Sequence, residues 1–282
     1  MHLSDNQPLG QRFSGSNLTK YDFANILFSG GSVCPCNAPC PYCIGRQIDP
    51  RLQIDNLDLY PLRNLDRFIE WIDRHAIRQV VLTGTNTDPL LYRHQARLIA
   101  YLREALPGVQ LSLHTNGRLA LKQMGIFNRY DRVSISLPSF DPAVYRKMMG
   151  VPGQPALAEI LRQARVPVKI SCLVTGDNRG ETGAFLERCR LLGIRRVALR
   201  KLYGERHSWR GLLSRQGLHL TQRGSFRGNP VYDFEGMEVT LWDFARTQTA
   251  SINLFSSGVI STEYLLARPG IVTGLSSFTF SG

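Results

Sequence analysis

Three cysteines on one short loop are the residues of this sequence best suited to chemistry. They stand in the segment Cys36-Asn-Ala-Pro-Cys40-Pro-Tyr-Cys43, with an aromatic residue directly before the last cysteine. Three thiolates on one tight loop can converge on one face of a cubane iron–sulfur cluster, each binding one iron. The fourth iron then has no protein ligand and is open to a small molecule, as in catalytic metal sites. We therefore expect Cys36, Cys40 and Cys43 to hold a [4Fe–4S] cluster.

A zinc site is the second interpretation of these cysteines. Cys34 lies two residues before Cys36, so four cysteines could supply a tetrahedral set for a non-enzymatic interaction module. The Cys34-Pro-Cys36 spacing is shorter than the roughly two to four intervening residues usual in such sites. Cys172 and Cys189 stand alone in the chain, and we expect both to be buried packing residues.

The elements around the cysteine loop alternate between apolar strands and amphipathic helices. Strands are expected at residues 24–28, 79–82, 109–113, 132–137, 166–174 and 196–202. Helices are expected at 62–77, 93–106, 119–126, 142–149 (after an N-cap at Asp141), 157–164 and 181–192. This order predicts an α/β fold, a partial (βα)6 TIM-like barrel with a parallel sheet. Each strand is followed by a polar or glycine-containing segment, and in such sheets chemistry gathers at the carboxyl ends of the strands.

Changes in local composition divide the chain into three parts. Residues 1–22 read as a lead-in, 23–206 as the barrel, and 207–282 as a small β-rich C-terminal extension packed on the barrel. Four aromatic residues of the extension could form a stacking surface for RNA bases, or belong to the core as aromatics at strand spacing usually do. They are Tyr232, Phe234, Trp242 and Phe255.

Composition indicates a globular protein with anionic partners. The apolar share is 43%, and the net charge is +12, from 34 Lys and Arg against 22 acidic residues. Such a charge favours the binding of nucleotides, nucleic acid, a phosphorylated substrate or an acidic redox protein. A generally basic solvated surface explains the charge equally well, so the charge alone does not identify a partner. The arginines are spread along the chain, without the compact block typical of a nucleic-acid arm. Without an apolar run of membrane-spanning or signal-peptide length, we expect a cytoplasmic location and no membrane partner.

The cysteine spacing, Tyr42 and the position of the loop after the first strand together resemble the signature of the radical S-adenosylmethionine (SAM) superfamily. The resemblance extends over about residues 25–203 and is closest to the pyranopterin-synthase-like branch. It implies that the open iron chelates SAM, that one electron cleaves the C5′–S bond, and that the 5′-deoxyadenosyl radical abstracts hydrogen from a substrate. It also implies a small-molecule substrate in cofactor or natural-product biosynthesis, and an electron donor such as flavodoxin or ferredoxin.

The resemblance also implies roles for residues at the strand ends. Residues 83–89 stand in the place of the family's Gly-Gly-Glu-Pro turn, and Thr115-Asn116-Gly117 match its threonine–asparagine–glycine turn. The implied SAM-binding residues are Tyr42, Gly84, Thr85, Thr115, Asn116, Ser136 and Leu202. The implied catalytic or substrate-facing residues are Asn86, Asp88, His114, Lys169 and Arg200, with Lys201 as a further candidate.

One departure from the branch bears on the reaction. Pyranopterin synthases bind guanosine triphosphate partly through a second cluster on three C-terminal cysteines, and no cysteine follows Cys189 here. We therefore do not expect the reaction for which that branch is named. The same radical chemistry applied to RNA or to a peptide is the alternative, which the charge permits but no sequence motif supports.

Overall fold

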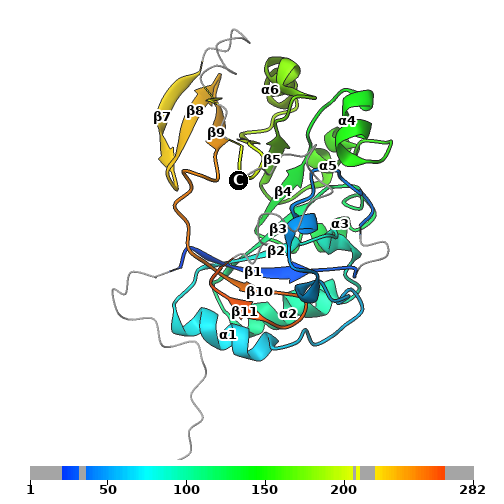
Figure 1. Cartoon of the computed structure of the whole chain (residues 1–282), viewed down its shortest axis with the longest axis vertical. Helices are drawn as coiled ribbons and strands as arrows, with labels where there is room; N and C mark the ends of the chain where they lie inside the picture. Colours follow the sequence, from blue (N-terminus) through cyan, green and yellow to red (C-terminus); the bar gives the residue numbers. More distant parts are fainter. Residues whose placement is uncertain (1–20, 32–35, 206–207, 210–219, 264–282) are drawn as a thin grey trace, which may run out of the picture.

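A single mixed sheet forms the centre of the molecule. The computed structural model describes residues 21–31, 36–205, 208–209 and 220–263 (Figure 1). Its 11-stranded sheet has the order β11-β10-β1-β2-β3-β4-β5-β6-β9-β8-β7. The strands are β1 (Phe23–Phe28), β2 (Gln79–Gly84), β3 (Gln110–Thr115), β4 (Arg132–Ser136), β5 (Val168–Leu173), β6 (Arg196–Arg200), β7 (Thr221–Phe226), β8 (Asn229–Phe234), β9 (Met237–Trp242), β10 (Ser251–Leu254) and β11 (Ile260–Ser261).

The strands from β1 to β6 pair in parallel and in chain order, which confirms the expected partial barrel. The intervening helices are α1 (Leu65–Arg74), α2 (Gln95–Ala105), α3 (Met124–Phe127), α4 (Pro142–Met149), α5 (Leu157–Gln163) and α6 (Thr182–Leu191). Short 3₁₀ turns are η2 (Ile44–Gln47), η3 (Pro50–Leu52), η4 (Pro89–Leu91) and η5 (Arg179–Glu181). Among the described residues, no helix combines the length and the apolar character needed to cross a bilayer.

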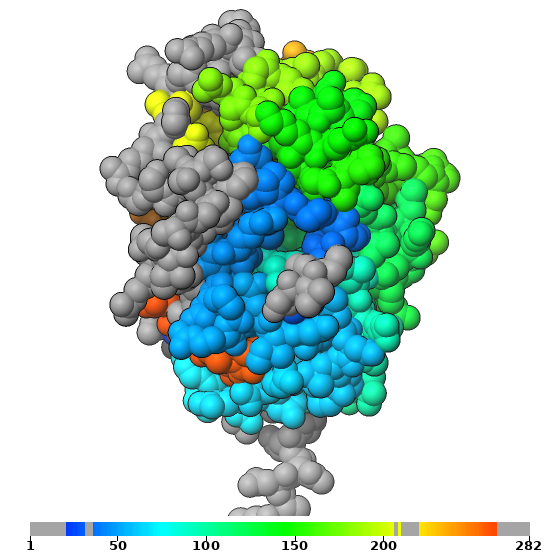
Figure 2. Space-filling view, turned by 45° about the vertical axis from the view of Figure 1, so that its right-hand side comes forward, coloured from blue at the N-terminus to red at the C-terminus, as the bar shows by residue number. Residues whose placement is uncertain are grey.

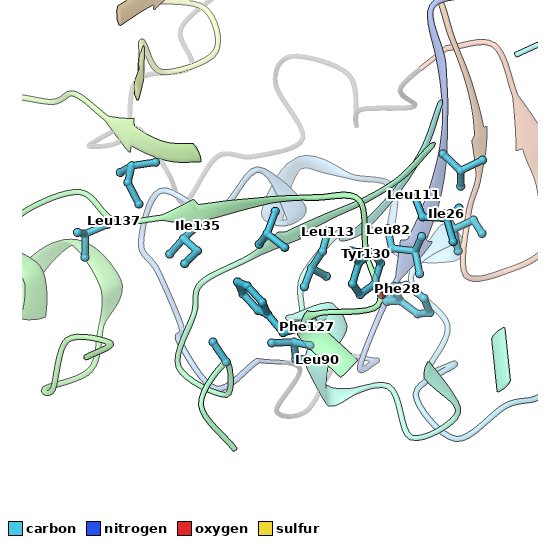
Figure 3. Packing of buried hydrophobic residues seen from close by; sticks show 14 of the residues in the cluster. Ile26, Phe28, Leu82, Leu90, Leu111, Leu113, Phe127, Tyr130, Ile135 and Leu137 are labelled. Carbon is cyan, nitrogen blue, oxygen red and sulfur yellow. The ribbon is translucent and has the colours of Figure 1, made fainter. Parts of the chain in front are cut away.

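The two faces of the sheet differ in polarity because side chains alternate along each strand. One face is apolar and packs under the helices, and Figure 3 shows Ile26, Leu82 and Leu113 in this layer. The other face is polar: His114 of β3 pairs in register with Ser134 of β4, which pairs with Lys169 of β5. The polar face therefore provides functional groups, while the apolar face provides stability.

Most of the expected elements are present to within a few residues. Asp141 caps α4 as expected, since its Oδ1 accepts hydrogen bonds from the Ala143 and Val144 amides at 2.8 Å. The helix expected at 119–126 is much shorter, because this segment consists of turns up to Gln123 and only then enters α3. Cys172 and Cys189 are buried in the core, as predicted.

The C-terminal extension joins both edges of the barrel sheet. β9 pairs in parallel with β6 at one edge, and β10 pairs in parallel with β1 at the other. Residues 243–250 connect these two strands across the open side of the barrel, where they appear in orange in Figure 1. This connection is fixed by hydrogen bonds from the Gln248 amide to the Arg227 carbonyl, 2.9 Å, and from the Asp22 amide to the Ala250 carbonyl, 2.8 Å. The extension thus bridges the sheet edges that the first six strands leave apart.

Two of the four aromatic residues considered for RNA stacking belong to the core. Phe234 is 9% exposed and Phe255 is 1% exposed, so neither can stack on a base. Strand periodicity puts an aromatic residue on one face of a sheet, but it does not distinguish a core face from a binding face. Tyr232 and Trp242 are half-buried.

Replacement of Asn253 tests the attachment of the extension. Asn253 is fully buried, and its Oδ1 accepts a hydrogen bond from Asn25 Nδ2 of β1 at 2.7 Å. In Asn253→Ala the Asn25 amide loses this acceptor, and we expect the free energy of unfolding to fall by about 1–3 kcal/mol. Urea denaturation measures the change, with the exposed neighbour Thr249→Ala as control. Equal stability of the two variants would contradict the importance of this contact.

Candidate active site

A cavity of about 280 Å³ opens at the carboxyl ends of the parallel strands. It is lined by the cysteine loop, by the loops after β2 and β3, and by the ends of β4, β5 and β6. Figure 2 shows a hollow in this face of the molecule beside the blue segments that follow β1. Of the residues implied by sequence, those on the cavity wall are Cys36, Cys40, Tyr42, Cys43, Gly84, Thr85, Asn86, Asp88, His114, Thr115, Asn116, Ser136, Arg200, Lys201 and Leu202.

The three cysteines lie on one side of the cavity, and each touches a different neighbouring element. Cys36 Sγ is 3.9 Å from Asn116 Nδ2, Cys40 Sγ is 3.8 Å from Met149 Sδ, and Cys43 Sγ is 3.5 Å from the Thr85 carbonyl oxygen. Burial raises the pKa of Cys36 to about 11 and that of Cys40 to about 12, and it also raises the pKa of Cys43. Metal binding must therefore displace the thiol protons.

The donor set fits an iron–sulfur cubane. The described residues include no three His, Cys, Asp or Glu side chains placed to hold a single metal ion. A cubane distributes its thiolates over separate irons, so its three cysteines need not meet at one point. Cys34, on which the zinc interpretation depends, lies outside the described residues.

Gly45 positions the cysteine loop, and sequence reasoning missed it. It follows Cys43 in η2, where a Cβ would lie 2.1 Å from the Thr85 carbonyl oxygen and 2.9 Å from Asn86 Cα. Only glycine allows this close approach of two backbones. Gly84 is under a similar constraint, since a Cβ there would lie 1.7 Å from the Thr87 carbonyl oxygen. A glycine two residues after the last cysteine was the available signal.

Asn86, implied to face substrate, lies on the cavity wall, and its side-chain amide is bound to the segment after β1. Its Oδ1 accepts hydrogen bonds from Ser29 Oγ at 3.0 Å and from the Gly30 amide at 3.3 Å. Its Nδ2 donates to the Gly31 carbonyl at 2.8 Å. Because both ends of the amide are engaged, Asn86 holds the segment after β1 against the loop after β2.

Asp88, implied to be a catalytic or substrate-facing residue, borders the cavity and binds two neighbouring loops. It is 3% exposed, and its carboxylate accepts hydrogen bonds from the Leu90 amide at 2.9 Å and the Asn116 amide at 2.6 Å. The Thr115 hydroxyl donates to the same carboxylate at 2.9 Å. Burial raises the pKa of Asp88, while these three donors oppose the shift. Asp88 therefore joins the loops after β2 and β3.

Asn116 extends this network to the cysteine loop. Its Nδ2 donates to Asn37 Oδ1 at 2.7 Å, and its Oδ1 accepts from the Arg118 amide at 3.0 Å. Gly117 turns the chain with a φ of 76°, and its amide donates to the Thr115 hydroxyl oxygen at 3.0 Å. The threonine–asparagine–glycine turn thus orients Asn116 beside Cys36.

Tyr42 fastens the other side of the cysteine loop. Its hydroxyl donates to Asp177 Oδ2 at 2.5 Å, and Lys147 of α4 pairs with Asp177 Oδ1 at 2.6 Å. The hydrogen bonds from Lys147 and Tyr42 lower the pKa of Asp177, so it stays ionised near neutral pH. This network, which the sequence did not reveal, ties the loop to α4 and to the segment after β5.

Positive charge lies on the barrel's polar face near the cavity. Arg200 and His114 line the cavity, and Lys169 interacts electrostatically with both. Burial and the cations Arg200, Arg196 and Arg227 lower the pKa of Lys169 to about 8. Burial, with Lys169 and Arg200, lowers the pKa of His114 to about 3, so its imidazole is neutral at working pH.

The remaining wall comes from the end of β6 and from the extension. Lys201, a further substrate-facing candidate, borders the cavity, and its ammonium pairs with Asp243 at 2.7 Å in a buried contact. The next residue, Phe244, lines the cavity and meets Tyr203 edge-on, with ring centroids 5.7 Å apart. The guanidinium of Arg200 lies 5.1 Å from the Phe244 centroid. Sequence reasoning missed Phe244, because it is distant along the chain from every motif.

A parallel open barrel with a three-cysteine loop at the carboxyl ends of its strands defines a class of cluster-dependent α/β enzymes. The family model of the Radical SAM superfamily matches residues 34–189, more than half of the chain. The chain therefore belongs to the radical SAM superfamily, whose members use a [4Fe–4S] cluster and SAM.

Two relatives illustrate its similarity to known sequences. One is the "GTP 3',8-cyclase" of Xanthomonas axonopodis pv. citri, 30% identical over 174 residues, which are 56% of this chain and 49% of that protein. The other is the "Probable GTP 3',8-cyclase" of Methanococcus aeolicus, 26% identical over 177 residues, which are 58% of this chain and 55% of that protein. The chain spans about half the length of these relatives.

The fold is similar to that of Streptococcus suis SuiB, solved with S-adenosylmethionine bound. The TM-score is 0.51 at 15% sequence identity, over 70% of this chain and 44% of that chain. The structure of SuiB with its precursor peptide SuiA also gives a TM-score of 0.51, at 16% identity, over 64% of this chain and 40% of that chain. At these identities the similarity concerns the fold.

Replacement of Gly45 tests the fit of the two backbones. In Gly45→Ala the new methyl group cannot occupy its place, so the cysteine loop must move away from the loop after β2. We expect the midpoint of thermal unfolding to fall by several degrees, and iron retention after anaerobic reconstitution to fall at least twofold. Gly125→Ala, where no atom lies within 4 Å of the added Cβ, is the matched control. If the two variants have the same thermal midpoint and retain the same amount of iron, the cysteine loop can accommodate the methyl group without moving.

Proposed function

We propose that the protein binds a [4Fe–4S] cluster through Cys36, Cys40 and Cys43 and cleaves SAM reductively to act on a small anionic substrate. The observation that carries the proposal is the arrangement of one cavity. Three thiols lie on one wall, the loops after β2 and β3 adjoin them, and Arg200 lies at the end of β6. Lys169, near the start of β5, is not among the residues that line the cavity, but it interacts electrostatically with Arg200 and His114.

The cluster ligands would be held by the neighbours described above. Asn116 fixes the Cys36 side of the loop, Met149 contacts Cys40, and the Thr85 backbone supports Cys43. When bound, the cluster supplies the single electron that cleaves the C5′–S bond of SAM and yields the 5′-deoxyadenosyl radical. The protein's contribution is to place the reacting groups and to limit their exposure to water.

SAM would lie between the cysteine loop and the strand ends. The backbone of Gly84 and Thr85 borders the cavity and offers hydrogen-bonding groups for an amino-acid ligand. Ser136 at the end of β4 and Leu202 after β6 border it on the far side. Asp88 and Asn86 would hold these loops in place through their hydrogen bonds.

The cations on the polar face favour a substrate with an anionic group. Lys169 is half-buried, and Arg200, Arg196 and Arg227 lie near enough to lower its pKa, with Glu238 as a weaker opposing neighbour. An anionic ligand that reaches Lys169 would relieve the repulsion among these cations. His114, held neutral, can accept or donate one hydrogen bond without adding charge.

The proposed reaction is stated at the level of a substrate class. The relatives are named as GTP 3',8-cyclases, and the chain matches about half of their length. We therefore assign the generation of the radical and hydrogen abstraction from an anionic small molecule in cofactor or natural-product biosynthesis.

The production of 5′-deoxyadenosine tests the proposed chemistry. Anaerobically reconstituted protein should be brown, bind about four irons per chain, and release 5′-deoxyadenosine from SAM when dithionite is added. Cys40→Ala removes one of only three ligands, and we expect it to lower this product at least a hundredfold. Cys189→Ala, which removes a buried thiol of the core, serves as control. A colourless protein with one zinc ion would refute the proposal.

The pH dependence of anion binding tests the role of Lys169. Because the pKa of Lys169 is lowered to about 8, its ammonium is charged below that pH and neutral above it. We expect the affinity for sulfate, whose charge is constant in this range, to fall about tenfold between pH 7 and pH 9. Calorimetry measures the dissociation constant, and Lys169→Met should bind weakly at both pH values. Equal sulfate affinity of wild type and Lys169→Met at pH 7 would contradict this role, and the exposed Lys122→Met is the control.

A further inference from the structure

Three arginines lie close to the cysteine loop, either through a direct electrostatic interaction or within three residues of a side chain that contacts a cysteine. Arg46 follows Cys43 by three residues in η2, and it interacts electrostatically with both Cys40 and Cys43. Arg118 follows Asn116, whose Nδ2 contacts Cys36 Sγ. The third is Arg146 of α4. Because each arginine is close along the chain to a residue of the loop or to one that contacts it, all three belong to the neighbourhood of the cysteine loop.

Arg146 belongs to the helix that packs directly on the loop. It precedes Met149, the Cys40 contact, by three residues, which is less than one helical turn. At the end of this helix, a Cβ on Gly150 would lie 2.6 Å from the Pro39 carbonyl oxygen. The carboxyl end of α4 and the cysteine loop therefore form one continuous surface, and Figure 2 shows the green helix segment beside the blue loop.

The charge of this surface is not neutralised by the protein itself. Arg46 and Arg146 are exposed and have no ion-pair partner among the described residues, and Arg118 donates to the carbonyls of Pro152 and Gly153 instead of to a carboxylate. Lys147 lies on the same helix, but its charge is paired with Asp177. The surface thus keeps three guanidinium groups available to an external anion.

We propose that Arg46, Arg118 and Arg146 form the docking surface for an acidic one-electron carrier protein. This inference rests on the proposed function, since the cluster needs an electron that the chain does not supply. In the transfer the carrier is oxidised by one electron and the cluster is reduced by one, and no atom or proton moves between them. Exposed Pro39 and the Cys40–Met149 contact place the cluster loop directly behind this surface.

An acidic protein suits this surface better than a small anion does. The three arginines lie on three different elements and are exposed or half-buried, so they do not form a closed pocket. Spread surface charge acts over the distance of a Debye length and steers the encounter with an oppositely charged protein. The net charge of +12 strengthens this attraction, but only the charges near the cysteine loop orient the carrier.

Charge reversal at Arg146 tests the docking surface. With reduced flavodoxin as the acidic carrier, Arg146→Glu in the reconstituted enzyme should raise the carrier's KM about tenfold at low ionic strength and weaken its salt dependence. With dithionite, a small reductant that needs no docking, the rate of 5′-deoxyadenosine formation should stay unchanged. Arg74→Glu, an exposed charge reversal at the end of α1, is the matched control.

A binding measurement separates docking from turnover. Calorimetry with flavodoxin should show a dissociation constant raised about tenfold by Arg146→Glu and by Arg46→Glu, but not by Arg74→Glu. If the three variants bind flavodoxin equally while dithionite still supports SAM cleavage, the docking surface is wrong and the proposed function stands. If neither reductant yields 5′-deoxyadenosine with the wild type, the proposed function fails, and the docking inference fails with it.

Discussion

The buried carboxylate of Asp88 is the interaction on which the arrangement of the cavity depends. It lies between two loops and satisfies donors from both, the Leu90 amide of its own loop and the Thr115 hydroxyl and Asn116 amide of the next. An unpaired charge in this place would be costly, so the two loops are held together wherever the carboxylate is ionised. Asn116 then reaches Asn37 on the cysteine loop. One acid therefore determines how three segments meet.

Close backbone packing complements this polar network. Gly45 brings the end of the cysteine loop to the carbonyl of Thr85, and Gly150 brings α4 to the carbonyl of Pro39. Side chains at these positions would separate the segments, so the positions of the thiols depend on glycines that carry no functional group. The Tyr42–Asp177–Lys147 network closes the remaining side. The loop is thus supported from both flanks before any ligand is bound.

The extension contributes to the site as well as to the sheet. Its strands occupy both edges of the barrel, and the connection between them contains Asp243, which pairs with Lys201, and Phe244, which lines the cavity. The superfamily model matches residues 34–189, the part that contains the three cysteines. Phe244 therefore lies outside the matched superfamily region, where features particular to this protein can arise.

The sequence by itself determined the fold and the proposal for the cluster ligands, because both depend on local patterns of residues. Strand and helix periodicity predicted the order of the parallel strands, and the spacing of Cys36, Cys40 and Cys43 specified a loop able to hold three irons. Only the tertiary structure decided the roles of Asn86 and Asp88. Their loop order suggested contact with a ligand, but their hydrogen bonds go to segments 27 to 57 residues distant. Such hydrogen-bond partners are brought together by the packing of the whole sheet. No periodic pattern in the sequence identifies them.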